Sequence, residues 1–132
     1  DLASLAARMA GGTILAAREL LAGNALTAVN FAGAKHHAMA NRSSGFCVLN
    51  DFALNAKHIL DDETNKIRRI AILDIDAHHG DGTEALLEKD PRVFTFSVHD
   101  RSIFPGTGHQ DDPDNHVFNR KDLYFPFLLL FF

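Results

Sequence analysis

Apolar residues in the first part of the chain recur with the period of an α-helix. Most of them are alanine or leucine, which are strong helix formers. A Gly-Asn pair at residues 23–24 is typical of a helix C-terminus. The pattern therefore predicts a first helix that ends near residue 22, with these residues at roughly helical spacing: Leu2, Leu5, Met9, Ala16 and Leu20.

Strand and helix patterns alternate along the rest of the chain. Residues 26–31 have the pattern of a short strand, and Asn50 or Asp51 can cap a second helix that runs to about Leu60. Four apolar residues, 70–73, are typical of a strand buried on both faces of a parallel sheet. A short helix at residues 83–88 and a buried strand at residues 93–98 follow. Two β-α-β crossovers result, and they predict an α/β fold with a parallel sheet covered by helices.

The end of the chain departs from this alternation. Residues 123–132 are nearly all apolar and are interrupted by Pro126. The run is too short to span a bilayer as a helix. Two interpretations are open: a buried strand whose partner elements are missing, or a misread or truncated end without functional meaning. We favour the second interpretation.

Composition limits the class of protein. The chain has 132 residues, of which 46% are hydrophobic and 23% charged, and this suits one soluble domain with a core. The net charge of −4 argues against nucleic-acid binding, which usually requires a basic face. The single cysteine, Cys47, excludes an internal disulfide, and no signal-peptide pattern is present. We therefore expect an intracellular, cytoplasmic protein that binds neither nucleic acid nor a membrane. The first residue, Asp1 in place of a methionine, indicates that the sequence starts inside a longer chain.

Carboxylates and imidazoles gather directly after the central strand. If the backbone stays extended, Asp74, Asp76 and His78 project to one side. In open α/β sheets the carboxyl ends of the strands are where ligands bind. The cluster therefore predicts a metal site or an acid/base site, whereas the neighbouring His79 has no role that we can argue.

A second pair of histidines, His36 and His37, lies in a loop earlier in the chain. In a parallel sheet this loop and the acidic cluster open on the same edge. Histidine titrates near neutrality, which suits proton transfer. Asp74 and Asp81 are the carboxylates available to fix the tautomers of these two rings.

Four segments in order resemble the zinc-dependent histone deacetylase family, which includes the bacterial acetoin-utilisation and acetylpolyamine amidohydrolase-like proteins. They are GAKHH at 33–37, SGFCVLND at 44–51, DIDAHHGDG at 74–82 and FPGTG at 104–108. The resemblance implies a three-layer αβα fold with a mainly parallel sheet, as in arginases and deacetylases. It covers residues 1–119 as an incomplete catalytic domain, and residues 120–132 form an anomalous apolar tail.

The resemblance also implies roles for individual residues. Zinc, with iron(II) as the alternative, is bound by Asp76 and His78, and His36 and His37 transfer protons. Asp74 and Asp81 orient these histidines. The substrate, an acetylated lysine of a peptide or protein or an acetylated small amine, contacts three residues: Gly45, Phe46 and Phe104. A structural potassium ion is bound by Asp74, Asp76, His78, Ser97 and Val98.

Two parts of the family's site have no match in this sequence. The third zinc ligand and the carbonyl-polarising tyrosine both come later in the family, and Tyr124 lies in the apolar tail. We therefore expect the chain alone to be inactive. The alternatives are a manganese-dependent arginase-like ureohydrolase, because it shares the pattern of Asp76 and His78, a Cys47 hydrolase, or a binding module without activity. A calcium loop fits less well, because His79 and Ala85 stand where glycine and glutamate are required.

Overall fold

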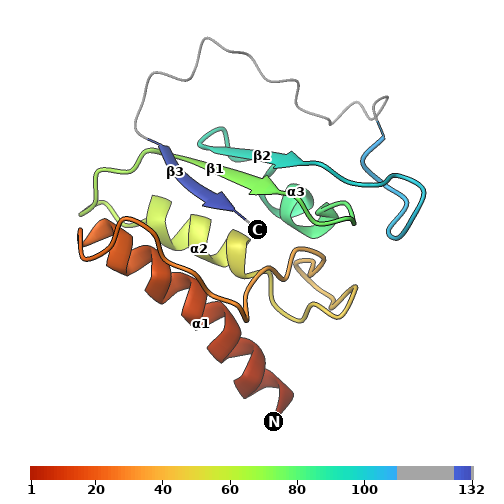
Figure 1. Cartoon of the computed structure of the whole chain (residues 1–132), viewed down its shortest axis with the longest axis horizontal. Helices are drawn as coiled ribbons and strands as arrows, with labels where there is room; N and C mark the ends of the chain where they lie inside the picture. Colours follow the sequence, from red (N-terminus) through yellow and green to blue (C-terminus); the bar gives the residue numbers. More distant parts are fainter. Residues whose placement is uncertain (110–126, 132) are drawn as a thin grey trace.

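A three-stranded parallel sheet organises the structure, a computed structural model that describes residues 1–109 and 127–131. Strand β1 (Arg69–Asp74) is its central strand. It pairs in parallel with β2 (Val93–Ser97) on one side and with β3 (Phe127–Phe131) on the other. Figure 1 shows the three strands running in the same direction. The predicted α/β architecture with a parallel sheet is thus confirmed.

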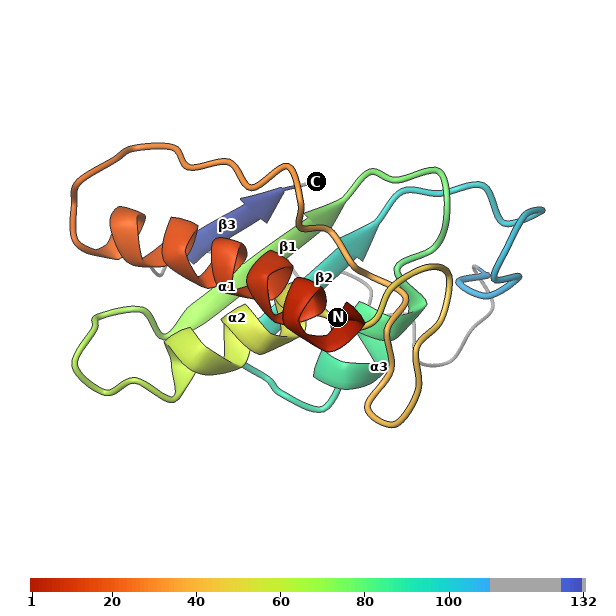
Figure 2. The ribbon, with the colours of Figure 1, turned by 90° about the horizontal axis from the view of Figure 1, so that it is seen from below.

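The helices lie together on one face of this sheet. They are α1 (Leu2–Leu21), α2 (Asp51–Leu60) and α3 (Asp81–Leu87). Helix α2 packs against β1 and α3 against β2, whereas α1 contacts α2 from the outside. Figure 2, seen from the helical side, shows α1 and α2 in front of the strands. The described residues include one helical layer of the expected three-layer arrangement and no helix on the other face of the sheet.

Helix α1 forms where predicted but buries a different face. The Asp1 side chain caps it by accepting a hydrogen bond from the Ser4 backbone N–H at 2.8 Å. Leu2 and Leu5 are 65% and 50% exposed, although they belong to the predicted apolar face. The buried face consists of small side chains, because only these let α1 approach α2 closely: Ala6, Ala10, Thr13 and Ala17.

The hydrophobic core lies between β1 and the helices. Alternate residues of β1 are buried, and Ile70 and Ile72 pack against side chains of α2 and α3. Asp74 occupies the next position of this alternation and is buried as well. The strand that supplies the core therefore delivers a carboxylate to the same face at its carboxyl end.

Residues 26–31 are not a strand, so the predicted first β-α-β crossover does not form. Leu26, Val29 and Phe31 have exposed fractions of 102%, 67% and 100%. Both sides of β1 are already paired with β2 and β3, which leaves this segment no place beside the central strand. The described residues contain one such crossover, from β1 through α3 to β2.

The apolar end of the chain supplies β3, whose residues 127–131 pair with residues 69–73 of β1. The strand alternative is therefore the one that the structure shows for these five residues. The division between residues 1–119 and 120–132 falls among residues outside the described part, as does Tyr124.

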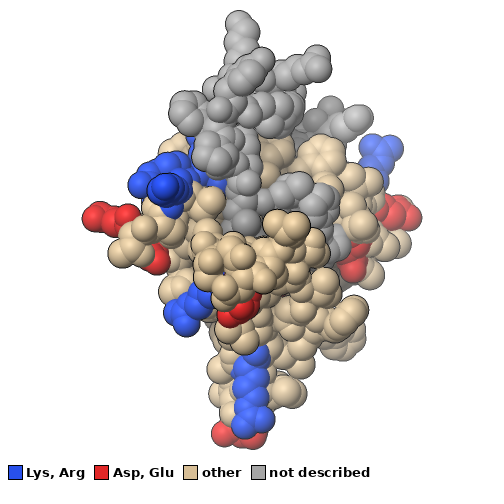
Figure 3. All heavy atoms as spheres, turned by 60° about the vertical axis from the view of Figure 1, so that its left-hand side comes forward, with Lys and Arg blue, Asp and Glu red and all other residues tan. Residues whose placement is uncertain are grey.

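Two observations concern surfaces. No helix among residues 1–109 is long and apolar enough to cross a membrane. Figure 3 shows one face of the molecule, on which the basic and acidic side chains of the described residues are interspersed. On that face they do not gather into a patch of one sign.

Candidate functional site

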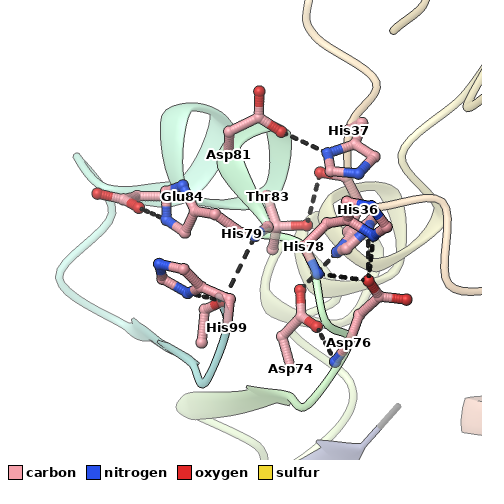
Figure 4. A network of polar contacts seen from close by, with 12 residues as sticks. His36, His37, Asp74, Asp76, His78, His79, Asp81, Thr83, Glu84 and His99 are labelled. Carbon is pink, nitrogen blue, oxygen red and sulfur yellow. Dashed lines mark hydrogen bonds and ion pairs between the residues drawn. The ribbon is translucent and has the colours of Figure 1, made fainter. Parts of the chain in front are cut away.

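The ring of His36 is fixed by a buried carboxylate. Its Nδ1 lies 2.7 Å from Oδ2 of Asp74, the last residue of β1 (Figure 4). His36 and Asp74 are only 4% and 3% exposed. The other oxygen of Asp74 accepts a hydrogen bond from the Asp76 backbone N–H at 3.0 Å. Asp74 therefore orients one histidine and also begins the turn that carries the next acidic residue.

A second carboxylate fixes the neighbouring histidine in the same way. The Nδ1 of His37 lies 2.7 Å from Oδ1 of Asp81, the first residue of α3. The rings of His36 and His37 are 3.9 Å apart between centroids and tilted by 44°. The structure thus places one of the two predicted orienting carboxylates on each of the two histidines.

Asn50, the N-cap residue of α2, holds the loop that carries both histidines through its side-chain amide. Its Nδ2 lies 3.3 Å from the His36 carbonyl oxygen, 3.4 Å from that of Ala38 and 3.1 Å from Oγ1 of Thr83. The Thr83 backbone N–H also donates to the His36 carbonyl at 3.0 Å. Because α2 and α3 both hold this loop, the two imidazoles keep one orientation.

Gly82 permits the close contact between α3 and this loop. A Cβ atom at Gly82 would lie 2.5 Å from the Ala38 carbonyl oxygen and 2.6 Å from that of His36. Real Cβ atoms do not approach backbone oxygens so closely, so only glycine fits there.

The predicted metal ligands Asp76 and His78 lie side by side after the end of β1. Oδ1 of Asp76 accepts the His78 backbone N–H at 2.7 Å and lies 2.9 Å from His78 Nδ1. It is also 4.0 Å from Nε2 of His36. The side chains of Asp76 and His78 are 45% and 43% exposed, so an ion in solution can reach both.

The route by which these residues meet differs from the prediction. An extended backbone was expected to place Asp74, Asp76 and His78 on one side, but β1 ends at Asp74. A turn follows, in which the Asp76 carboxylate binds the backbone N–H two residues ahead. The condition of an extended backbone is therefore not met beyond Asp74, and the turn brings Asp76 and His78 together instead.

The environment of Asp76 favours its ionised form. Burial by itself would raise the pKa of this carboxyl. The hydrogen bonds from the backbone and ring of His78, with the nearby imidazole of His36, outweigh that effect and lower the pKa below its ordinary value. The carboxylate is therefore ionised at neutral pH.

Two of the three predicted substrate-contacting residues, Gly45 and Phe104, lie against His37. Gly45 has φ +50°, and a Cβ there would lie 2.3 Å from Cδ2 of His37. Its carbonyl oxygen is 3.4 Å from the Cys47 thiol. Phe46 is fully exposed with φ +63°. The ring of Phe104 lies 5.0 Å from that of His37 between centroids, at 80°.

The predicted potassium ligands meet in part. Ser97 is the register partner of Asp74, and the Val98 backbone N–H donates to the Asp74 carbonyl at 2.9 Å. The Ser97 hydroxyl lies 2.9 Å from Nδ1 of His99. The ends of β1 and β2 thus bring Ser97 and Val98 to Asp74, the residue at which the turn that carries Asp76 and His78 begins.

Asp51 is a site residue that the sequence pattern did not reveal, because it was interpreted only as a helix cap. It is fully buried, and its carboxylate accepts hydrogen bonds from the backbone N–H groups of Ala34 at 3.1 Å and Lys35 at 2.8 Å. The hydroxyl of Thr13 in α1 donates to the same carboxylate. Asp51 therefore fixes the backbone directly before His36.

The metal-ligand set is incomplete within the described ranges. Residues 1–109 and 127–131 contain no group of three or more His, Cys, Asp or Glu side chains placed to hold one metal ion. Among these residues Asp76 and His78 form a pair of possible donors without a third.

Comparison with known proteins agrees with this geometry. The family model for the histone deacetylase domain matches residues 1–127. Histone deacetylase clr6 of Schizosaccharomyces pombe is 48% identical over 104 residues, which are 78% of this chain and 25% of that protein. The acetoin utilization protein AcuC of Bacillus subtilis is 41% identical over 105 residues, 78% of this chain and 26% of that protein.

The chain spans about a quarter of the length of these relatives. The match nonetheless includes all the carboxylates and histidines described above, because the family model extends over both segments that carry them. The chain belongs to the histone deacetylase family.

Proposed function

We propose that this chain is part of a zinc-dependent deacetylase that removes acetyl groups from lysine side chains or from acetylated small amines. The observation that supports this proposal is the paired arrangement of His36 with Asp74 and of His37 with Asp81, beside Asp76 and His78. The activity belongs to the complete protein, because the chain spans only a quarter of its relatives. Alone, the chain is expected to be inactive.

Asp76 and His78 fit a zinc ion by the chemistry of their donors. Oδ1 of Asp76 and Nδ1 of His78 are 2.9 Å apart, and a mixed oxygen and nitrogen set suits zinc, with iron(II) as the alternative. Catalytic zinc usually has three protein ligands, so we expect the third outside the described residues. When bound, the metal polarises the amide carbonyl and makes the attacking water more acidic.

His36 and His37 are proposed to carry the protons of the reaction. Hydrolysis requires a base that takes a proton from water and an acid that protonates the leaving amine. In each pair the ring Nδ1–H donates to a carboxylate, which directs Nε2 away from Asp74 or Asp81. Nε2 of His36 lies 4.0 Å from Asp76, so this imidazole can transfer a proton beside the proposed metal ligands.

The substrate is proposed to enter between Phe46 and Phe104. Both side chains are exposed, and Phe104 packs edge-on against His37. Apolar walls of this kind suit the aliphatic chain of an acetylated lysine or amine. The carbonyl of Gly45 is proposed to accept the substrate amide N–H, because the thiol that contacts it is only a weak donor.

A potassium ion is proposed to stabilise the ends of β1 and β2. Asp74, Asp76, His78 and Val98 would contribute backbone or carboxylate oxygens, and Ser97 its hydroxyl. Oxygen donors suit a hard cation, and the sheet register already brings Ser97 and Val98 to Asp74. The ion would thereby hold the turn that carries the proposed zinc ligands.

Calorimetric titration of the chain with zinc tests the metal site. We expect weak binding, since only two ligands are described, and loss of that binding in His78→Ala. The matched control is His58→Ala, because His58 lies in α2 and contacts Arg18 at the surface. Equal zinc affinity of the wild type and His78→Ala would contradict the proposal, and a preference for manganese over zinc would favour an arginase-like ureohydrolase.

The proton-transfer role is tested in a complete catalytic domain that contains this segment. His37→Ala should lower the turnover of an acetyl-lysine substrate by roughly 10²-fold or more, a typical contribution of a general acid or base. Zinc content should remain unchanged. Loss of zinc in His37→Ala would identify His37 as a ligand and contradict the assigned role.

A further inference from the structure

His79 directly follows the proposed zinc ligand His78 but is turned away from it. The residue is 6% exposed, and its Nε2 lies 2.6 Å from Oε2 of Glu84 in α3. Its Nδ1 lies 2.8 Å from the hydroxyl of Thr107. Figure 4 shows the ring directed toward Glu84 and away from Asp76. Because both ring nitrogens have partners, the imidazole links α3 to the loop at residues 103–108.

A second imidazole holds the same loop. Nε2 of His99 lies 3.0 Å from the Gly108 carbonyl oxygen, and its Nδ1 lies 2.9 Å from the Ser97 hydroxyl. The rings of His79 and His99 are 4.5 Å apart between centroids. Gly108 has φ +75°, and a Cβ there would come within 2.7 Å of both rings. Thr107 and Gly108 are therefore held against two imidazole rings, that of the buried His79 and that of the half-buried His99.

The held residues are close to Phe104 along the chain. The Gly106 backbone N–H donates to the Ile103 carbonyl at 2.9 Å, which closes a tight turn containing Phe104. On the other side of this turn the Phe104 ring meets His37 at 5.0 Å and His78 at 6.3 Å between centroids. The place of the Phe104 ring thus depends on where Thr107 is fixed.

We propose that His79 is a positioning residue that, through Glu84 and Thr107, sets the place of the Phe104 ring relative to His37. Phe104 is one wall of the proposed substrate channel, the passage between Phe46 and Phe104. The two adjacent histidines then have different roles. His78 is a proposed zinc ligand, and His79 holds the loop at residues 103–108. The part that concerns the channel rests on the proposed deacetylase function. The anchoring itself is a property of this chain and is tested without activity.

The anchor formed by the contacts of His79 with Glu84 and Thr107 is tested by nuclear magnetic resonance of the full chain with labelled aromatic rings. We expect a nuclear Overhauser effect between the Phe104 and His37 rings in the wild type and its loss in Thr107→Val. Thr107 is exposed, so this variant should fold, and the resonances of the buried Phe52 should stay in place. The matched control is Thr64→Val in an exposed turn, which should retain the effect.

His79→Gln provides a second variant, because it removes the ring that spans Glu84 and Thr107. It should likewise lose the effect between Phe104 and His37. An unchanged Overhauser effect in Thr107→Val, or in a folded His79→Gln variant, would overturn the proposal that His79 positions the loop.

Kinetic measurements in a complete catalytic domain test whether holding the loop at residues 103–108 also affects substrate binding. Thr107→Val should raise the KM for an acetyl-lysine substrate roughly three- to tenfold, the effect of one lost hydrogen bond, and change kcat less. Loss of the Overhauser effect with an unchanged KM would overturn the channel role and leave the anchor. A wild-type domain without deacetylase activity would contradict the proposed function, and the Overhauser effect would still decide the anchor.

Discussion

The carboxylate of Asp51 accepts the backbone N–H of Lys35 at 2.8 Å, one residue before the first imidazole of the site. Asp51 is fully buried and begins α2, so the helix and the loop that carries His36 and His37 share this group. Its side-chain oxygens also accept the Ala34 N–H and the Thr13 hydroxyl. The position of the two histidines thus depends on a carboxylate that binds the backbone directly before them.

Replacement of Asp51 by asparagine should destabilise the fold. One carboxylate oxygen becomes an amide NH₂, which cannot accept hydrogen bonds from the donors that face it. The buried donors left without an acceptor should lower the free energy of unfolding by about 1–3 kcal/mol. Urea unfolding of Asp51→Asn measures this. Asp100→Asn, at an exposed turn, is the control and should change the stability by no more than about 0.5 kcal/mol. Equal stability of the two variants would contradict the role of Asp51.

Alanine at two glycines should have opposite effects. Gly45→Ala places a Cβ 2.3 Å from His37 at a left-handed backbone position, so it should destabilise the fold and shift the His37 ring resonances. Gly11 lies within α1 at a place where a Cβ would meet open space, and Gly11→Ala should stabilise the fold by roughly 0.5–1 kcal/mol. Thermal unfolding compares both variants, and a stable Gly45→Ala with an unmoved His37 would refute the close contact.

The carboxyl of Asp76 should titrate below its ordinary pKa of 3.8. The folded state then binds this proton less tightly than the unfolded state does. Its stabilising contribution is complete above the ordinary pKa and is lost as the pH falls through the lower, folded value. Carbon-13 titration of the carboxyl measures this pKa, and His78→Ala should raise it by removing a ring hydrogen bond. A wild-type pKa at or above 3.8 would contradict the geometry.

Cys47 should react slowly with alkylating agents in the folded chain. The residue is 5% exposed, and burial raises the pKa of its thiol, so little thiolate is present at neutral pH. Iodoacetamide labelling followed by mass spectrometry should show slow modification without urea and rapid modification with it. Rapid labelling of the folded chain would instead support the alternative of a cysteine hydrolase.

The sequence pattern predicted those elements whose form depends on local features. The helix beginning after Asn50 and the strands that begin near Ile70 and at Val93 were expected from a cap and from short apolar runs. The burial expected for the strand at Val93 was wrong, because none of its residues is buried and Phe96 is 49% exposed. Residues 26–31 were predicted as a strand and are not one, because a strand also requires a neighbour with which to pair. Which strands flank β1 is decided by contacts between distant segments, and local patterns do not contain that information.

The candidate site shows the same division. Asp74 and Asp81 were expected as the carboxylates that orient His36 and His37, but the sequence did not indicate that Asp74 contacts His36 and Asp81 contacts His37. The contact of Asp51 with the loop before His36 was not expected, because a carboxylate at a helix start has an adequate local explanation. His79 had no assigned role, since its partners Glu84 and Thr107 become adjacent only in the folded chain.

The two histidine–carboxylate pairs have a consequence for the order of events during folding. His36 is separated from Asp74 by 38 residues and His37 from Asp81 by 44. Closing loops of this length costs entropy before any contact compensates for it, and such contacts slow folding. During synthesis the imidazoles leave the ribosome well before their carboxylates, so His36 and His37 acquire their orientation only when β1 and α3 have joined the earlier segment.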